Sequence, residues 1–95
     1  MSVKIIIDLQ VKRGMKSDFS KLLEELRMKA IATKGYISGE SLWASEDPHN
    51  CGVISTWHSE EEWRNWEKSP ERKEIEGKIE KLMVRPTKVK MYLNA

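Results

Sequence analysis

The chain has 95 residues, the length of one domain, and residues 1–95 are enough for a hydrophobic core without disulfides or metals. Its 17 Lys and Arg nearly balance 15 Asp and Glu, so neither nucleic acid nor a membrane surface is expected as a partner. The single cysteine excludes an internal disulfide, and the first apolar run is too short for a signal peptide, which predicts a cytoplasmic protein.

The first predicted strand covers residues 3–11, where apolar and mostly polar side chains alternate. Ser17 then fits a helix N-cap, and apolar residues recur at helical spacing from Phe19 onward. The predicted helix runs to about Thr33 and is stopped by Gly35.

Two more strands are predicted on either side of a polar turn. The first covers residues 36–45, where Gly39 indicates a bulge or a close approach of the backbone. Residues 46–50 have turn chemistry, and the second strand follows over residues 51–57, so the two strands form a hairpin.

Two helix starts follow one another after the hairpin. Ser59 and Glu62 form a capping box, and Ser69-Pro70 begins a second helix that Pro86 ends. A final strand alternates through Val89, Met91 and Leu93. The whole order predicts an α+β, ferredoxin-like β-α-β-β-α-β fold with helices on one face of a four-stranded antiparallel sheet.

Three of the four tryptophans lie close together in the chain. Trp57 ends a strand, and Trp63 shares a helix face with Trp66, so Trp57 and Trp63 are interpreted as core anchors. For Trp66 two interpretations stay open: a core residue or the wall of a pocket.

The polar residues nearby predict no metal site. His58, His49 and Cys51 match no ligand spacing, and Cys51 is expected to be an inert thiol. His58 suits a general base, although a solvated residue at a helix start would look the same.

The central stretch also carries a family resemblance. The residues concerned are the strand-ending Trp57, then His58-Ser59-Glu60-Glu61, Trp63, Trp66, Ser69-Pro70 and Arg72, with Pro86-Thr87 before the last strand. Their order and spacing resemble the antibiotic biosynthesis monooxygenase (ABM) superfamily. The resemblance implies a ferredoxin-like fold that pairs through its sheets as a dimeric α/β barrel. It also implies relatives that oxidise quinols or polyketide aromatics without a cofactor, or that degrade haem.

Individual positions depart from the patterns of these relatives. The haem-degrading pattern has a His where this chain has Glu76 and an Asn where it has Ile7. The polyketide-oxidising pattern has an Asn at the position of Glu62 and a Tyr at that of Arg72. Only the pocket tryptophan, Trp66, is shared with both patterns, so neither chemistry transfers directly.

The resemblance implies a cofactor-independent monooxygenase of small, electron-rich aromatics of the quinol or enol type. Trp66, Trp43 and Phe19 are predicted to line a dry substrate pocket, with His58 as the base and Arg72 as an oxyanion partner. One alternative is a non-catalytic small-ligand-binding or interaction module on the same fold. Another is a haem-binding protein with His58 as the ligand.

A homodimer is also implied by the resemblance. The sheet face away from the helices is expected to carry mostly charged side chains, which suit water. Ile6, Tyr92 and Trp43 are the residues expected to supply a local apolar contact on it.

Overall fold

The computed structural model describes all residues, 1–95, and confirms the predicted α+β, ferredoxin-like fold. Its four strands form one antiparallel sheet in the order β2-β3-β1-β4. The strands are β1 (Val3–Gln10), β2 (Tyr36–Trp43), β3 (Asn50–Trp57) and β4 (Lys88–Leu93), and the helices are α1 (Lys16–Ile31), α2 (Glu60–Glu67) and α3 (Pro70–Glu80). The second helical segment is divided in two, as the successive start signals predicted.

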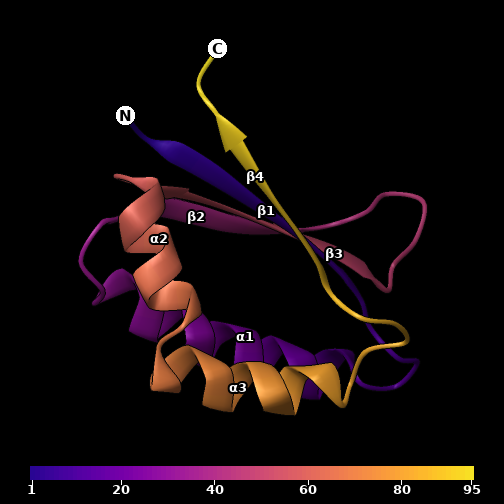
Figure 1. Cartoon of the computed structure of the whole chain (residues 1–95). Coiled ribbons are helices and arrows are strands. Elements are labelled where there is room, and N and C mark those ends of the chain that lie inside the picture. Colours follow the sequence, from indigo (N-terminus) through magenta and orange to yellow (C-terminus); the bar gives the residue numbers. More distant parts are fainter.

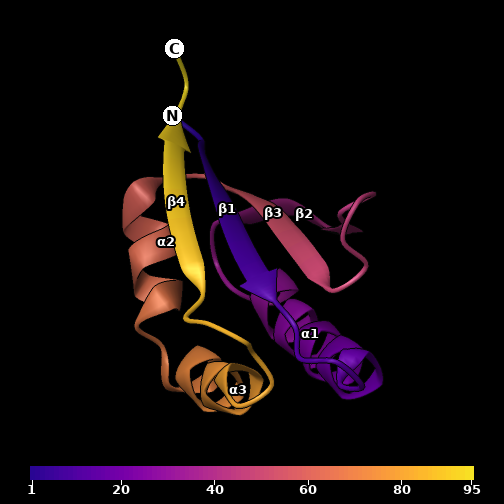
Figure 2. The ribbon, with the colours of Figure 1, turned by 90° about the vertical axis from the view of Figure 1, so that its right-hand side faces the viewer.

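The helices cover one face of the sheet and leave the other bare. Figure 1 shows α1 and α3 side by side below the sheet, while α2 connects the two layers at one end. Figure 2 shows the same two layers from the side, with β4 at the edge of the sheet. None of the helices has the length and apolar character needed to cross a membrane.

The core lies between these two layers. The alternating apolar residues of the first predicted strand are all buried, namely Val3, Ile5, Ile7, Leu9 and Val11. They face Phe19 of α1 and the tryptophans of β3 and α2. Removing this apolar surface from water is the main force that holds the helices on the sheet.

The start of α1 differs from the sequence prediction. The helix begins at Lys16, one residue before the predicted cap Ser17, and Met15 at the N-cap position provides no side-chain hydrogen bond. Gly14, with a φ of 82°, reverses the chain after β1. The fully buried Phe19 then anchors the first turn, and its amide donates to the Met15 carbonyl at 2.9 Å. Core packing therefore outweighs the capping preference of a serine.

Two glycines shape the connection from α1 to β2. Gly35 has a φ of 95°, which a side chain would strain, and a Cβ there would lie 2.4 Å from Glu62 Oε2. Gly39 makes the close approach predicted for it, since a Cβ would lie 2.5 Å from the hydroxyl of Tyr36. The bulge itself falls earlier, where the register shifts between Tyr36 and Ser38.

Both predicted N-caps of the second helical segment are present. The amide of Glu62 donates to Ser59 Oγ at 3.2 Å, and that of Arg72 donates to Ser69 Oγ at 3.2 Å. Pro70 occupies the start of α3, where its missing N–H is not needed. Because the two helices follow each other so closely, α2 can close the end of the core while α3 runs beside α1.

Candidate functional site

A small cavity of about 60 Å³ lies between the sheet and the helices, next to α2. We call it the inner cavity. Most of its wall is apolar, with polar groups from α1, α3 and the β2–β3 side of the sheet. It is lined by Ile7, Leu23, Leu26, Arg27, Ala30, Tyr36, Gly39, Glu40, Ser41, Val53, Ser55, Trp57, Trp63, Trp66 and Arg72.

Three tryptophans, from β3 and α2, form the wall of the inner cavity on the side of α2. Trp66 stacks on Trp57 with ring centroids 6.2 Å apart, and Trp63 meets Trp57 edge to face at 5.7 Å. Trp57 Nε1 donates to Ser55 Oγ at 3.1 Å, so its one polar group is satisfied inside the core. The predicted anchoring roles of Trp57 and Trp63 fit their burial, and Trp66 serves both as core and as cavity wall.

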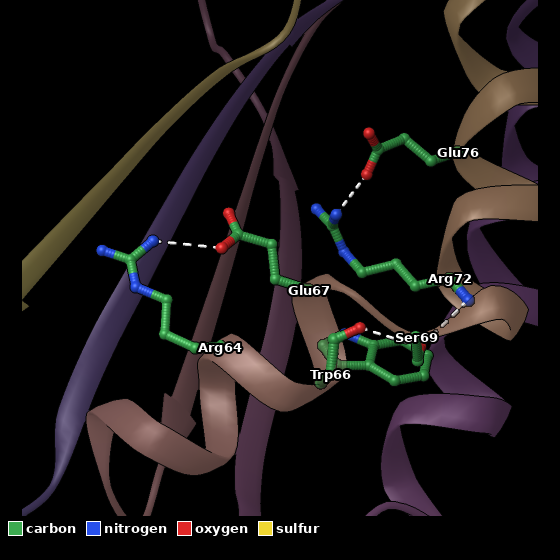
Figure 3. A network of polar contacts seen from close by, with 6 residues as sticks. All are labelled: Arg64, Trp66, Glu67, Ser69, Arg72 and Glu76. Carbon is green, nitrogen blue, oxygen red and sulfur yellow. Dashed lines mark hydrogen bonds and ion pairs between the residues drawn. The ribbon is translucent and has the colours of Figure 1, made fainter.

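Arg72 is the one charged residue that is buried in the chain. Figure 3 shows its side chain extending from α3 toward the sheet, where its guanidinium pairs with the carboxylate of Glu76 one helical turn later. The guanidinium also lies over the ring of Trp63, 5.2 Å from its centroid. The pair and the aromatic face together compensate for taking a cation out of water.

A larger opening of about 340 Å³, here called the outer cleft, adjoins the inner cavity and is also lined by Arg72. It shares Ile7, Leu23, Leu26, Val53 and Arg72 with the inner cavity. Its remaining lining residues come from β1, α2, α3, the segment that precedes β4, and β4 itself. They are Leu9, Glu67, Lys68, Lys73, Glu76, Ile79, Glu80, Thr87 and Val89. An apolar floor with a few charged groups suits a small, partly polar ligand.

The five residues predicted for the site are not brought together. Trp66 and Arg72 line the inner cavity, and Arg72 also lines the outer cleft. Phe19 and Trp43 pack edge to face at 5.8 Å, but neither lines the two cavities, and Phe19 is fully buried.

His58 lies apart from both cavities. Its side chain is 76% exposed, and Nδ1 lies 3.1 Å from Glu62 Oε1. The Ser59 hydroxyl donates to the same oxygen at 3.0 Å, and these contacts, that from Ser59 above all, hold the pKa of Glu62 below its ordinary value. His58 therefore supports a helix start, and its position favours neither a base nor a haem ligand.

Cys51 is fully enclosed on β3, although its place after a turn suggested partial exposure. Desolvation by this burial raises the pKa of its thiol, while a backbone hydrogen bond with Leu42 opposes the shift. A thiol that is harder to ionise is less reactive, as expected of an inert cysteine. No group of three or more His, Cys, Asp or Glu side chains lies close enough to hold a metal ion.

Glu76 is the site residue that the sequence argument missed. In the sequence it stands where haem-degrading relatives have a histidine, and it follows Arg72 by four residues on a predicted helix. Oppositely charged residues at this spacing are neighbours on one helix face. The sequence therefore indicated a possible Arg72–Glu76 ion pair. Exposed helices carry many such pairs, however, and only the fold shows that this one borders a cleft.

The comparisons with known proteins agree with this fold and extend over most of the chain. The family model described as antibiotic biosynthesis monooxygenase matches residues 2–78. No curated protein matches the sequence. The matched residues include β1, the three tryptophans of the inner cavity, and the Arg72–Glu76 pair.

Several solved structures have the same fold at low sequence identity. A conserved protein from Methanosarcina mazei Go1 is 20% identical, with a TM-score of 0.92, over 97% of this chain and 91% of that chain. Rv0793 from Mycobacterium tuberculosis is 16% identical, with a TM-score of 0.90, over 100% and 96%. SnoaB, a cofactor-independent oxygenase from Streptomyces nogalater, is 12% identical, with a TM-score of 0.89, over 99% and 93%.

Proposed function

Because this chain belongs to the antibiotic biosynthesis monooxygenase family, we propose that it is a cofactor-independent monooxygenase of small, electron-rich aromatics of the quinol or enol type. The structural likeness to SnoaB, a cofactor-independent oxygenase, supports the same reaction class. The observation that carries the proposal is the buried Arg72, which stands between a tryptophan-lined cavity and a cleft large enough for an aromatic ring.

The proposed reaction converts the CH₂ carbon that such an aromatic has in its keto tautomer into a carbonyl carbon. Loss of a proton gives a carbanion, which transfers one electron to O₂, and the resulting radical and superoxide combine to form a C–O bond. Protonation of the peroxide and loss of the second C–H proton cleave the O–O bond and release water. One oxygen atom stays in the product and the other leaves as water, so no further reductant is needed.

Two residues have positions that suit the polar steps. Arg72 stabilises the negative charge that develops on the aromatic oxygen when the carbon loses its proton, since a fixed cation in a water-poor site acts strongly. Glu76 contacts Arg72 and lines the outer cleft, so we assign the role of base to Glu76 in place of the exposed His58. The tryptophans and aliphatic side chains exclude water from the radical pair.

Oxygen uptake with a panel of quinols and enolisable aromatics tests the proposal. Wild type is expected to consume oxygen with at least one compound, and Trp66→Ala to be much slower, with Trp66→Phe as a variant that disturbs the core less. Trp43→Ala is the matched control because Trp43 is 40% exposed and lies outside both cavities. Absence of uptake across the panel would remove the proposal, and equal rates in the Trp66 variants would remove the role of Trp66.

The Arg72–Glu76 pair also favours a second candidate, a small-ligand-binding module without catalysis. The guanidinium of Arg72 lines the outer cleft beside Glu76, so the cleft can hold an aromatic anion by charge and leave it unchanged. This candidate predicts that aromatic acids raise the melting temperature of the protein while no oxygen is consumed. If no aromatic compound shifts the melting temperature, the binding module is excluded.

A further inference from the structure

The inner cavity and the outer cleft differ strongly in size although they share part of their walls. The outer cleft, at about 340 Å³, falls within the range of roughly 300–1,000 Å³ that is typical of small-molecule sites. The inner cavity, at about 60 Å³, is less than half the size of an engineered apolar cavity of roughly 150 Å³ that binds benzene in another protein. An aromatic ring can therefore enter the cleft, but it cannot enter the inner cavity.

The lining of the inner cavity is also unsuited to a polar occupant. A buried water needs two to four polar partners, and the polar groups nearest the tryptophans are already engaged, whereas Glu40 and Ser41 lie at exposed positions of β2. Ser55 Oγ accepts from Trp57, Arg27 donates to the Gly39 carbonyl at 2.9 Å, and Arg72 pairs with Glu76. The space that remains is bounded mainly by aromatic and aliphatic carbon, so a very small apolar molecule fits it better than water.

We propose that the inner cavity is a binding site for dioxygen, and that the aromatic substrate occupies the outer cleft. This inference rests on the proposed oxygenase function, because dioxygen is the second substrate of that reaction. The shared wall of Leu26, Val53 and Arg72 brings the two molecules next to each other. Trp66 then contacts dioxygen, and the substrate-facing residues are Arg72 and Glu76.

Binding dioxygen and the aromatic substrate in two adjoining spaces has a consequence for the reaction. A carbanion that forms in the cleft meets dioxygen from one side only, and the superoxide produced stays behind Arg72 in a water-poor space. Retention of superoxide beside the substrate radical favours formation of the C–O bond over escape and reduction of oxygen elsewhere. The arrangement also lets the aromatic substrate bind in the outer cleft without displacing dioxygen from the inner cavity.

Xenon is the probe for the direct test, because it is a small apolar atom that enters dry cavities. Crystals pressurised with xenon are expected to hold an atom in the inner cavity, beside Trp57 and Trp66. Ala30→Leu should exclude it, since Ala30 lines this cavity and is buried. Ala32→Leu is the matched control on an exposed position of the same segment, and Ala30→Val is a smaller change in case the leucine prevents folding.

Kinetics provide the second readout. Ala30→Leu or Ala30→Val should raise the KM for oxygen several-fold and leave the KM for the aromatic unchanged, whereas Ala32→Leu should change neither. Xenon found only in the outer cleft, or a variant that raises the KM of the aromatic instead, would overturn the dioxygen site. Xenon in the inner cavity without oxygen uptake for any aromatic would instead overturn the proposed oxygenase function.

Discussion

At the scale of single residues, the buried Arg72 is the feature that most needs an explanation. A guanidinium in a core costs stability unless an opposite charge lies beside it, and Glu76 provides that charge. The face of Trp63 offers further compensation. A chain that needed only a stable core could place an aliphatic residue here, so a charge kept at this position supports a role in binding or chemistry.

The pair makes a prediction for stability. Glu76→Gln leaves Arg72 with a neutral neighbour and should reduce the free energy of unfolding by about 1–3 kcal/mol, the usual penalty for an unsatisfied buried group. Glu74→Gln, on an exposed position of the same helix, should change it by less than about 0.5 kcal/mol. Urea unfolding at neutral pH measures both, and equal stability of the two variants would show that the ion pair contributes nothing.

At the scale of secondary-structure elements, the termini of the helices decide how the layers fit. The alternation of apolar and polar residues predicted β1 and its buried face, and the serine caps predicted the starts of α2 and α3. Both signals depend only on residues that are neighbours in the sequence. The N-cap of α1 lies at Met15, two residues before the predicted cap Ser17, because Phe19 and Gly14, through packing and a turn, determine where the helix begins. Tertiary contacts of this kind leave no local pattern in the sequence.

The connection from α1 to β2 depends on Gly35. Gly35→Ala should destabilise the protein more than Gly14→Ala, although both glycines have positive φ. Both variants incur the strain of a left-handed alanine, roughly 1–2 kcal/mol, but only Gly35 also meets a side chain, that of Glu62. A Cβ on Gly14 meets open space. Urea midpoints compare the two, and an equal loss would mean that Glu62 moves aside freely.

The N-terminal cap of α2 should make the free energy of unfolding depend on pH, because Glu62 takes part in it. Because the pKa of Glu62 is lower in the folded state than its ordinary value of 4.5, its contribution is complete above that value. The contribution is then lost as the pH falls through the lowered folded pKa. The stability difference between wild type and Glu62→Gln should therefore be present at pH 7 and disappear on acidification. A difference that stays constant down to low pH would contradict this assignment.

At the scale of the whole molecule, the fold was predictable and the site was only partly so. Trp43 and Phe19 were assigned to the pocket because both are aromatic, yet Trp43 pairs with Cys51, six residues along β3 from Trp57. Six residues of a strand extend about 20 Å, so these tryptophans lie at opposite ends of the sheet. Only the register of the hairpin reveals this, and the sequence signals leave the register open.

The bare face of the sheet leads to a prediction about assembly. Ile6 and Ile54 are neighbours on β1 and β3 and face away from the helices, and Leu42 and Tyr92 are exposed on the same face. Trp43 was expected on this face, but it pairs with the buried Cys51 and packs on Phe19 of α1, on the helix side. We expect a homodimer through this face at micromolar concentration, as in the dimeric barrels that the family resemblance implies. Light scattering coupled to size exclusion should give twice the mass of 11.1 kDa, and Ile54→Asp should give the monomer.

The control for assembly is a charge added away from the sheet. Ala32→Asp, on the exposed end of α1, should leave the dimer intact. A wild-type monomer at micromolar concentration would contradict the predicted assembly. A dimer that survives Ile54→Asp would mean that another surface holds it together.

The most direct test of the account is the rate of oxygen uptake when the buried charge pair is made neutral. Arg72→Gln combined with Glu76→Gln removes both charges of the pair and leaves neither unpaired, while Arg64→Gln removes an exposed charge on α2 as the control. With the best aromatic of the panel, kcat/KM should fall about 100- to 1,000-fold in the double variant, the usual effect of losing a group that stabilises an oxyanion. Arg64→Gln should match wild type, and a folded double variant that consumes oxygen at the wild-type rate would contradict the central role of Arg72.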